Sequence, residues 1–143
     1  MSTHTKPAVL FVCRKNGGKS QMAAGLMRLE AGDSVDVSSA GTQPGTEINA
    51  LSAEVLLELG ADIRNEHPTA LTNDSMRRAG LVVVLGPEAQ VDPVDGVRIE
   101  RWETDEPSLR GIGGRERMEL VRDDINRRVL ELKDRLLSGD APA

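Results

Sequence analysis

The chain has 143 residues, a formal net charge of −5 and 38% hydrophobic residues, which suits one domain with a sizeable core. The negative charge argues against a general binder of nucleic acid. Its one cysteine, Cys13, excludes an internal disulfide framework. No apolar stretch reaches the roughly 18–20 residues of a membrane span and no signal-peptide pattern is present, so we expect no membrane association and a cytoplasmic protein.

Strand and helix patterns alternate along the chain. Strands are predicted from apolar runs or two-residue alternation, and helices from apolar residues recurring every three or four positions. Asn49 is expected to cap the second helix and Gly60 to end it, whereas Thr72, Asn73 or Asp74 caps the third. In chain order the patterns predict a tail at 1–7, a strand at 8–12, a helix at 20–31, a strand at 35–40, helices at 50–59 and 71–79, strands at 81–85 and 98–102, a long helix from 114 and a tail at 138–143.

This alternation predicts an α/β fold in three layers, αβα, within a single domain spanning 1–143. Strand–helix–strand units are right-handed and give a parallel sheet with helices on both faces. Ligands of such sheets bind beyond the carboxyl ends of the strands. The loops that follow the strands at 8–12 and 98–102 are therefore expected at one edge of the sheet.

The segment CRKNGGKS, from Cys13 to Ser20, joins the first strand to the first helix. A strand, a glycine-bearing loop and a helix N-terminus form a cradle for an anion, because backbone N–H groups and the helix dipole attract negative charge. The same field stabilises a Cys13 thiolate, the nucleophilic form of the side chain, and the Ser20 hydroxyl can donate to its sulfur. The residues predicted to bind the anion are Arg14, Lys15, Asn16, Gly17, Gly18 and Lys19.

Two other interpretations of this segment are open. Cys13 could be an ordinary core cysteine, since cysteine is among the most buried residue types. Gly18-Lys19-Ser20 also fits the end of the nucleotide-binding pattern G-x-x-x-x-G-K-[ST], but Cys13 stands where its first glycine belongs. A cysteine-nucleophile loop for phosphate or arsenate accounts for every residue of the segment.

Two acids follow the predicted strand at 98–102. Asp105 and Glu106 would face Cys13 across a bound anion, where either could protonate a departing oxygen. We favour Asp105, with Glu106, which directly precedes a proline, as its close rival. The alternative is that both are solvated loop acids.

The Cys13–Ser20 segment resembles the C-x-x-N-x-x-[RK]-S loop of the low-molecular-weight protein tyrosine phosphatase fold, and more closely that of arsenate reductases on this fold. The stretch from Asn16 to Ala24 is similar to the actinobacterial branch, the arsenate–mycothiol transferases. The resemblance implies a four-stranded sheet in the order 2-1-3-4. Further matches extend it over nearly the whole chain: Ser39–Thr42, Gly60–Asp62, Trp102, Glu106–Pro107, Val121–Asp123 and Ile125.

The resemblance implies arsenate reduction in arsenic detoxification. The Cys13 thiolate would attack arsenate held by the loop amides, Lys19 and Arg14, and Asp105 or Glu106 would protonate the leaving hydroxide. Mycothiol is the implied co-substrate and mycoredoxin the downstream reductant, with no bound cofactor and no metal. Arsenate reductases of this fold that couple to thioredoxin bring two further cysteines of their own, which this sequence lacks.

Two other functions are open: a phosphomonoesterase of the tyrosine phosphatase type and a non-catalytic oxyanion-binding module. Lys19 counts against the phosphatase, because arginine grips phosphoryl oxygens bidentately and lysine does not. The sequence also departs from many relatives at Lys15, where they carry glycine. If that position needs a positive φ, Lys15 would strain the loop by roughly 1 kcal/mol.

Overall fold

The computed structural model describes residues 6–138, and the predicted strands and helices are all present there. Two short 3-10 turns, Gly32–Ser34 and Pro107–Arg110, accompany them. The elements are β1 (Ala8–Cys13), α1 (Lys19–Ala31), β2 (Asp36–Gly41), α2 (Ala50–Leu57), α3 (Asn73–Ala79), β3 (Leu81–Leu85), β4 (Arg98–Trp102) and α4 (Gly114–Leu137).

The four strands form one parallel sheet in the order β2-β1-β3-β4, which confirms the expected topology. β1 is central, and every residue from Val9 to Cys13 is buried, as its unbroken apolar sequence predicts. Cys13 is the last residue of β1 and pairs with Gly41 at the end of β2. The nucleophile candidate therefore stands at the carboxyl edge of the sheet.

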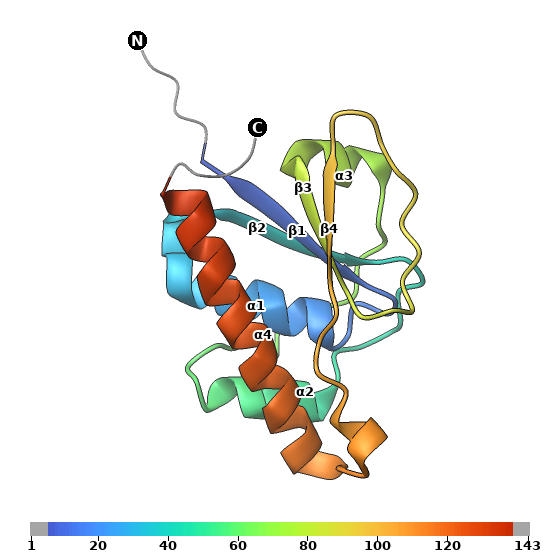
Figure 1. The fold of residues 1–143 in the computed structure, drawn as a ribbon, viewed down its shortest axis with the longest axis vertical. Helices are drawn as coiled ribbons and strands as arrows, with labels where there is room; N and C mark the ends of the chain where they lie inside the picture. The colour runs from blue at the N-terminus through green and yellow to red at the C-terminus, as the bar shows by residue number, and fades with distance from the viewer. Residues whose placement is uncertain (1–5, 139–143) are drawn as a thin grey trace.

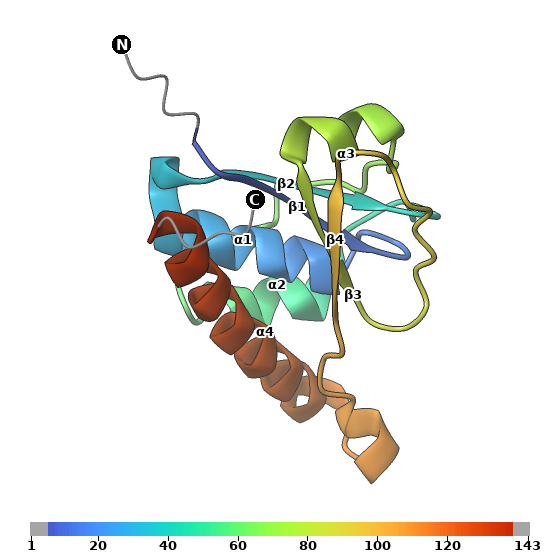
Figure 2. The same cartoon turned by 45° about the horizontal axis from the view of Figure 1, so that its top comes forward.

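Helices cover both faces of this sheet, giving the three layers (Figures 1 and 2). α1, α2 and α4 lie on one face, where α1 contacts both of the other two. α3 lies on the opposite face, where Met76 packs in a second, smaller core. On α1, a Cβ at Gly25 would stand 2.7 Å from Ile63 Cγ2, so only glycine permits this close approach.

α4 presents the apolar stripe that its sequence spacing predicts. Val121, Ile125, Val129 and Leu132 are buried in the larger core, and Met118 and Leu136 pack at its border. This packing places the first turns of α4 beside α2, close to the carboxyl edge of the sheet (Figure 1).

Some predicted boundaries were wrong. α2 ends at Leu57 because the following turn closes through Leu59 N–H to Leu56 O and Gly60 N–H to Leu57 O, leaving Leu59 38% exposed. Gly60 still marks the stop, with a φ of 93°. α3 begins at Asn73, and Thr72 is the cap among its three candidates.

The two predicted tails fall mainly outside the described residues, at 1–5 and 139–143. The tail residues that lie inside are bonded to the domain. Pro7 O accepts the Asp36 N–H at 2.8 Å, and Ser138 N–H donates to Asp134 O at 3.0 Å.

Candidate active site

The loop from Arg14 to Gly18 curves away from the end of β1 and back into α1. Backbone N–H groups of the segment after β2 donate to the carbonyl oxygens of Cys13 and of this loop. The bonds run from Thr42 N–H to Cys13 O, from Gln43 N–H to Arg14 O, from Gly45 N–H to Lys15 O and from Asn49 N–H to Gly17 O. Within residues 6–138 no hydrogen bond engages the N–H groups of Lys15, Gly17 and Gly18. The loop therefore has its acceptors occupied and its donors available, as an anion cradle requires.

The backbone of this loop depends on Asn16 and Gly17. In the described part of the chain, Asn16 is the one non-glycine residue with a positive φ, at 55°. Lys15 does not adopt a positive φ, so the backbone strain that such a φ would cause there is absent. The positive φ lies at Asn16, and asparagine tolerates the left-handed region better than most residues. At Gly17 a Cβ would stand 2.8 Å from Glu47 O, so this position requires glycine.

Cys13 is buried, with its sulfur facing two hydrogen-bonding groups. The Sγ lies 2.9 Å from Ser20 Oγ and accepts the Asn16 N–H at 3.2 Å. Ser20 Oγ in turn accepts from Asn16 Nδ2 at 2.8 Å, which leaves the hydroxyl hydrogen free to point at the sulfur. The Ser20 hydroxyl and the Asn16 N–H are thus placed to donate to the sulfur, which is the geometry that a thiolate at Cys13 would require.

The Asn16 side chain is fully buried behind the loop and does not line the cavity. Its Oδ1 accepts from Thr69 N–H at 2.9 Å and from Gln21 Nε2 at 3.2 Å. Asn16 was predicted to bind the anion, but it does not line the cavity, and its side chain instead fixes the loop and orients Ser20. Gln21 was missed as the partner of Asn16, because a glutamine in the first turn of a predicted helix does not by itself indicate a buried contact.

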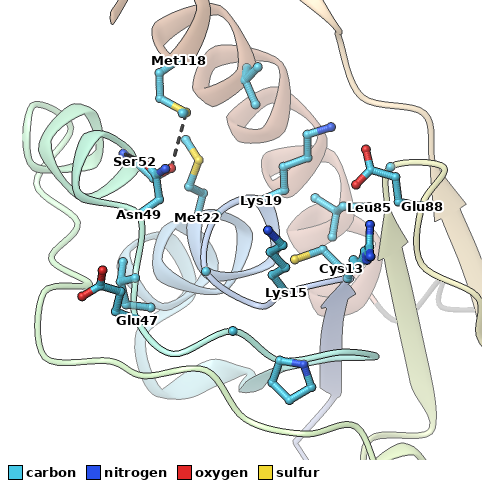
Figure 3. Close-up of a pocket in the computed structure, with 18 of the residues that line it drawn as sticks. Cys13, Lys15, Lys19, Met22, Glu47, Asn49, Ser52, Leu85, Glu88 and Met118 are labelled. Carbon is cyan, nitrogen blue, oxygen red and sulfur yellow. Dashed lines mark hydrogen bonds between the residues drawn. The ribbon is translucent and has the colours of Figure 1, made fainter. Parts of the chain in front are cut away.

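The three cations of the loop differ in their surroundings. Lys19, with a side chain 21% exposed, forms an ion pair with Glu106. Arg14 lies at the rim, where its Nε donates to Gln43 Oε1 at 3.0 Å. Lys15 is exposed and lines the cavity next to Cys13 (Figure 3).

The structure separates the two candidate acids. Asp105 accepts two hydrogen bonds from Arg110, at 2.8 and 3.1 Å, and these bonds lower the pKa of Asp105 below its ordinary value. Glu106 lines the cavity and contacts Lys19, whereas Asp105 does not line it. Because Glu106 faces the cavity whereas Asp105 faces Arg110, the geometry supports Glu106 over the favoured Asp105.

α4 holds the loop that bears these acids. Asp124 Oδ2 accepts the Asp105 N–H at 2.9 Å, and Arg128 donates to Glu103 O at 2.8 Å. Burial raises the pKa of Asp124, but the Asp105 N–H and two arginines outweigh it and lower the pKa. The acid loop is thereby fixed relative to the cysteine loop.

The two loops open into one cavity of about 890 Å³. Besides the cysteine loop and Glu106, its walls come from the segment after β2, the start of α2, the loop after β3 and the first turns of α4. Figure 3 shows Cys13, Lys15 and Lys19 grouped together, with Glu88 on one side and Met22, Asn49, Ser52 and Met118 on the other.

This site defines a class: parallel α/β proteins that carry a nucleophilic cysteine in an oxyanion-binding loop at the end of the central strand. Among known families, the one described as low molecular weight phosphotyrosine protein phosphatase matches residues 8–139. The chain belongs to this family.

Three similar proteins illustrate the relationship. "Arsenate reductase 1" of Staphylococcus haemolyticus is 31% identical over 137 residues, covering 92% of this chain and 98% of its own. "Arsenate reductase" of Staphylococcus aureus is 31% identical over 135 residues, covering 92% and 99%. The structure of a thioredoxin-dependent arsenate reductase of Corynebacterium glutamicum is 32% identical with a TM-score of 0.78, covering 93% of this chain but only 63% of that one.

Within residues 6–138, no helix combines the length and apolar character that crossing a membrane requires.

Proposed function

We propose that the protein is an arsenate reductase that acts as an arsenate–mycothiol transferase. The observation that carries the proposal is the setting of Cys13: a sulfur held by the Ser20 hydroxyl and the Asn16 N–H at the floor of a loop with unengaged N–H groups. The similarity to relatives named arsenate reductase, over nearly their full length, supports arsenate as the oxyanion.

In the first step arsenate occupies the loop, bound by the N–H groups of Lys15, Gly17 and Gly18 and by Lys19. The Cys13 thiolate attacks arsenic, an As–S bond forms, and an As–O bond breaks. Glu106 gives a proton to the departing hydroxide, which leaves as water. Arsenic stays As(V), because substitution at arsenic moves no electrons to it.

In the second step the mycothiol sulfur attacks arsenic and the Cys13 thiolate leaves. Glu106, now a carboxylate, takes the proton of the incoming thiol. The product is an As(V)–mycothiol adduct, again without reduction. A mycoredoxin thiol then attacks the mycothiol sulfur, two electrons pass to arsenic, and arsenite leaves together with a mixed disulfide.

Thioredoxin is the competing acceptor, because the Corynebacterium glutamicum structure is titled a thioredoxin-dependent enzyme. The sequence has one cysteine, so no second thiol of its own can resolve the Cys13 adduct into an intramolecular disulfide. This favours an external small thiol. The cytoplasm, where such thiols are kept reduced, is the compartment that this chemistry requires.

The test follows arsenate-dependent NADPH oxidation with two reductant systems. Mycothiol with mycoredoxin and its reductase should support steady turnover, and thioredoxin with thioredoxin reductase should not. Cys13→Ser should abolish turnover. Robust turnover with thioredoxin alone would overturn the transferase mechanism.

Two further outcomes would favour the other functions of this family. Phosphate release from p-nitrophenyl phosphate without any thiol would identify a phosphomonoesterase. Arsenate binding with no thiol consumption would identify a non-catalytic oxyanion module.

A further inference from the structure

The cavity is far larger than arsenate requires. A tetrahedral oxyanion has five non-hydrogen atoms, and a water takes up about 30 Å³ in the liquid, so the anion fills at most roughly 150 Å³. The cavity measures about 890 Å³, within the range of about 300–1,000 Å³ typical of small-molecule sites. Most of it therefore lies outside the oxyanion cradle.

The remaining space extends toward α2 and α4, away from Glu88. Figure 3 shows Met22, Asn49, Ser52 and Met118 grouped on this side of Cys13. We call this part the α2–α4 subsite, and its walls are formed by Met22, Glu47, Ile48, Asn49, Ser52, Arg117, Met118 and Val121.

Arg117 is the unexplained residue of this subsite. Its Nε is buried, and nothing in the part of the chain that the structure describes accepts a hydrogen bond from it. No carboxylate within residues 6–138 pairs with its guanidinium, although most arginines of α4 have such partners. A buried donor without an acceptor is costly, and a bound ligand can supply the acceptor.

Other polar groups of the subsite are also available. Asn49 uses its Oδ1 to accept the Ser52 N–H at 2.9 Å, while its amide nitrogen donates to no residue between 6 and 138. Among the described residues, the hydrogen-bond partner of Ser52 Oγ is Met118 Sδ, at 3.4 Å, and a thioether is a weak acceptor. The donors alternate with the apolar surfaces of Met22, Ile48 and Val121, so the subsite suits an amphipathic ligand rich in hydroxyl and carbonyl oxygens.

The charge of the subsite is balanced. Arg117 is its one cation and Glu47 its one anion among the described residues that line it. The excess of positive charge lies instead on the cysteine loop, with Arg14, Lys15 and Lys19. A ligand of the subsite therefore needs acceptor groups but no net charge.

We infer that the α2–α4 subsite binds the body of the thiol co-substrate, a neutral, hydroxyl- and amide-bearing small thiol, and that Arg117 is its main hydrogen-bond donor. The inference rests on the proposed transferase function, because a thiol bound here reaches the arsenic on Cys13 through the shared cavity. Arg117 acts on binding of the thiol and takes no part in the attack of Cys13 on arsenate.

The direct test measures binding without turnover. S-methylmycothiol, which cannot react, is titrated into the protein by calorimetry. Arg117→Met should weaken its binding about tenfold or more, as loss of a hydrogen bond from a charged donor does. Arg78→Met is the matched control: it removes the same charge from an exposed position on α3, across the sheet, that forms no ion pair within residues 6–138, and it should leave binding unchanged. S-methylglutathione, which carries net negative charge, should bind more weakly than S-methylmycothiol.

Kinetics separate this inference from the proposed function. Arg117→Met should raise the KM for mycothiol about tenfold with kcat and the KM for arsenate little changed. Arsenate should still protect Cys13 of this variant from iodoacetamide, which shows that the fold and the cradle are intact.

Equal affinity of wild type and Arg117→Met for S-methylmycothiol, or tighter binding of S-methylglutathione, would overturn the subsite even if the wild type consumed mycothiol with arsenate. A wild type that consumed no thiol would refute the transferase proposal, and binding of S-methylmycothiol would still decide whether the subsite exists.

Discussion

Substitution of Asn16 should lower both stability and activity, because one buried side chain holds the cysteine loop. In Asn16→Ala the part-buried hydrogen bond from the Thr69 N–H is lost, at a cost of about 0.5–1.5 kcal/mol. Gln21 Nε2 keeps two other acceptors, Asn16 O and His67 O, so the loss of its bond to the Asn16 side chain adds little to the cost in free energy of unfolding. Alanine at a φ of 55° costs about 1–2 kcal/mol more. The expected loss in free energy of unfolding is therefore about 1.5–3.5 kcal/mol.

Asn16→Gly separates the two contributions. It also removes the side-chain hydrogen bonds but adopts a positive φ freely, so it should be about 1 kcal/mol more stable than Asn16→Ala. Both variants should lose kcat, by about tenfold or more, because Ser20 is no longer oriented toward Cys13 by the Asn16 amide.

Urea unfolding followed by circular dichroism gives the free energies. Asn73→Ala, at an exposed position of α3, is the control and should stay within about 0.5 kcal/mol of wild type. If Asn16→Ala also stayed within about 0.5 kcal/mol, the buried hydrogen bonds would not hold the loop. If Asn16→Gly were the less stable variant, the strain assigned to the positive φ would be wrong.

Three further predictions concern the acids and the nucleophile. Glu106→Gln should lower kcat by about 100-fold or more, and Asp105→Asn by less than about tenfold, in the coupled arsenate assay; the opposite ranking would return the acid role to Asp105. Ser20→Ala should slow iodoacetamide alkylation of Cys13, and an unchanged rate would show that the hydroxyl does not stabilise the thiolate. Hydrogen bonds from a neighbouring arginine lower the pKa of Asp62 to about 2. The contribution of this pairing to the free energy of unfolding is therefore complete above the unfolded pKa of about 3.9 and is lost as the pH falls through about 2. The difference in Tm between wild type and Asp62→Asn should shrink over that range, and a difference that grew would contradict this pairing.

The sheet and the cysteine loop were predictable because their signals are local. The apolar run of β1 and the Cys13–Ser20 spacing each lie within a few consecutive residues. The need for glycine at position 17, by contrast, comes from Glu47 O on the distant segment after β2. The strand order followed from the family resemblance, since a period-two pattern does not say which strands are neighbours.

The role of Asn16 was not predictable in the same way. Its partners Gln21 and Thr69 are separated along the chain, and only the folded loop brings the Thr69 N–H to the Asn16 carbonyl oxygen. The pattern C-x-x-N-x-x-[RK]-S marks the position as important, but it does not distinguish a side chain that binds the anion from one that supports the loop.

Which of Asp105 and Glu106 faces the cavity could not be predicted from the sequence either. Adjacent residues in an extended segment point in different directions, so one of two neighbouring acids faces the cavity and the other does not. Which of the two acids faces the cavity depends on Arg110, in the 3-10 turn Pro107–Arg110, and on the hydrogen bond from Asp105 N–H to Asp124.

The ion pair between Lys19 and Glu106 connects substrate binding to the chemistry that follows it. In the free protein the two charges offset each other at the mouth of the loop. An arsenate anion in the cradle becomes a second negative group competing for Lys19. We expect anion binding to loosen the ion pair, so that the Glu106 carboxyl turns toward the departing hydroxide only when substrate is bound. Asp105 could not respond in this way, because its charge is neutralised by Arg110 whether or not the cradle is occupied.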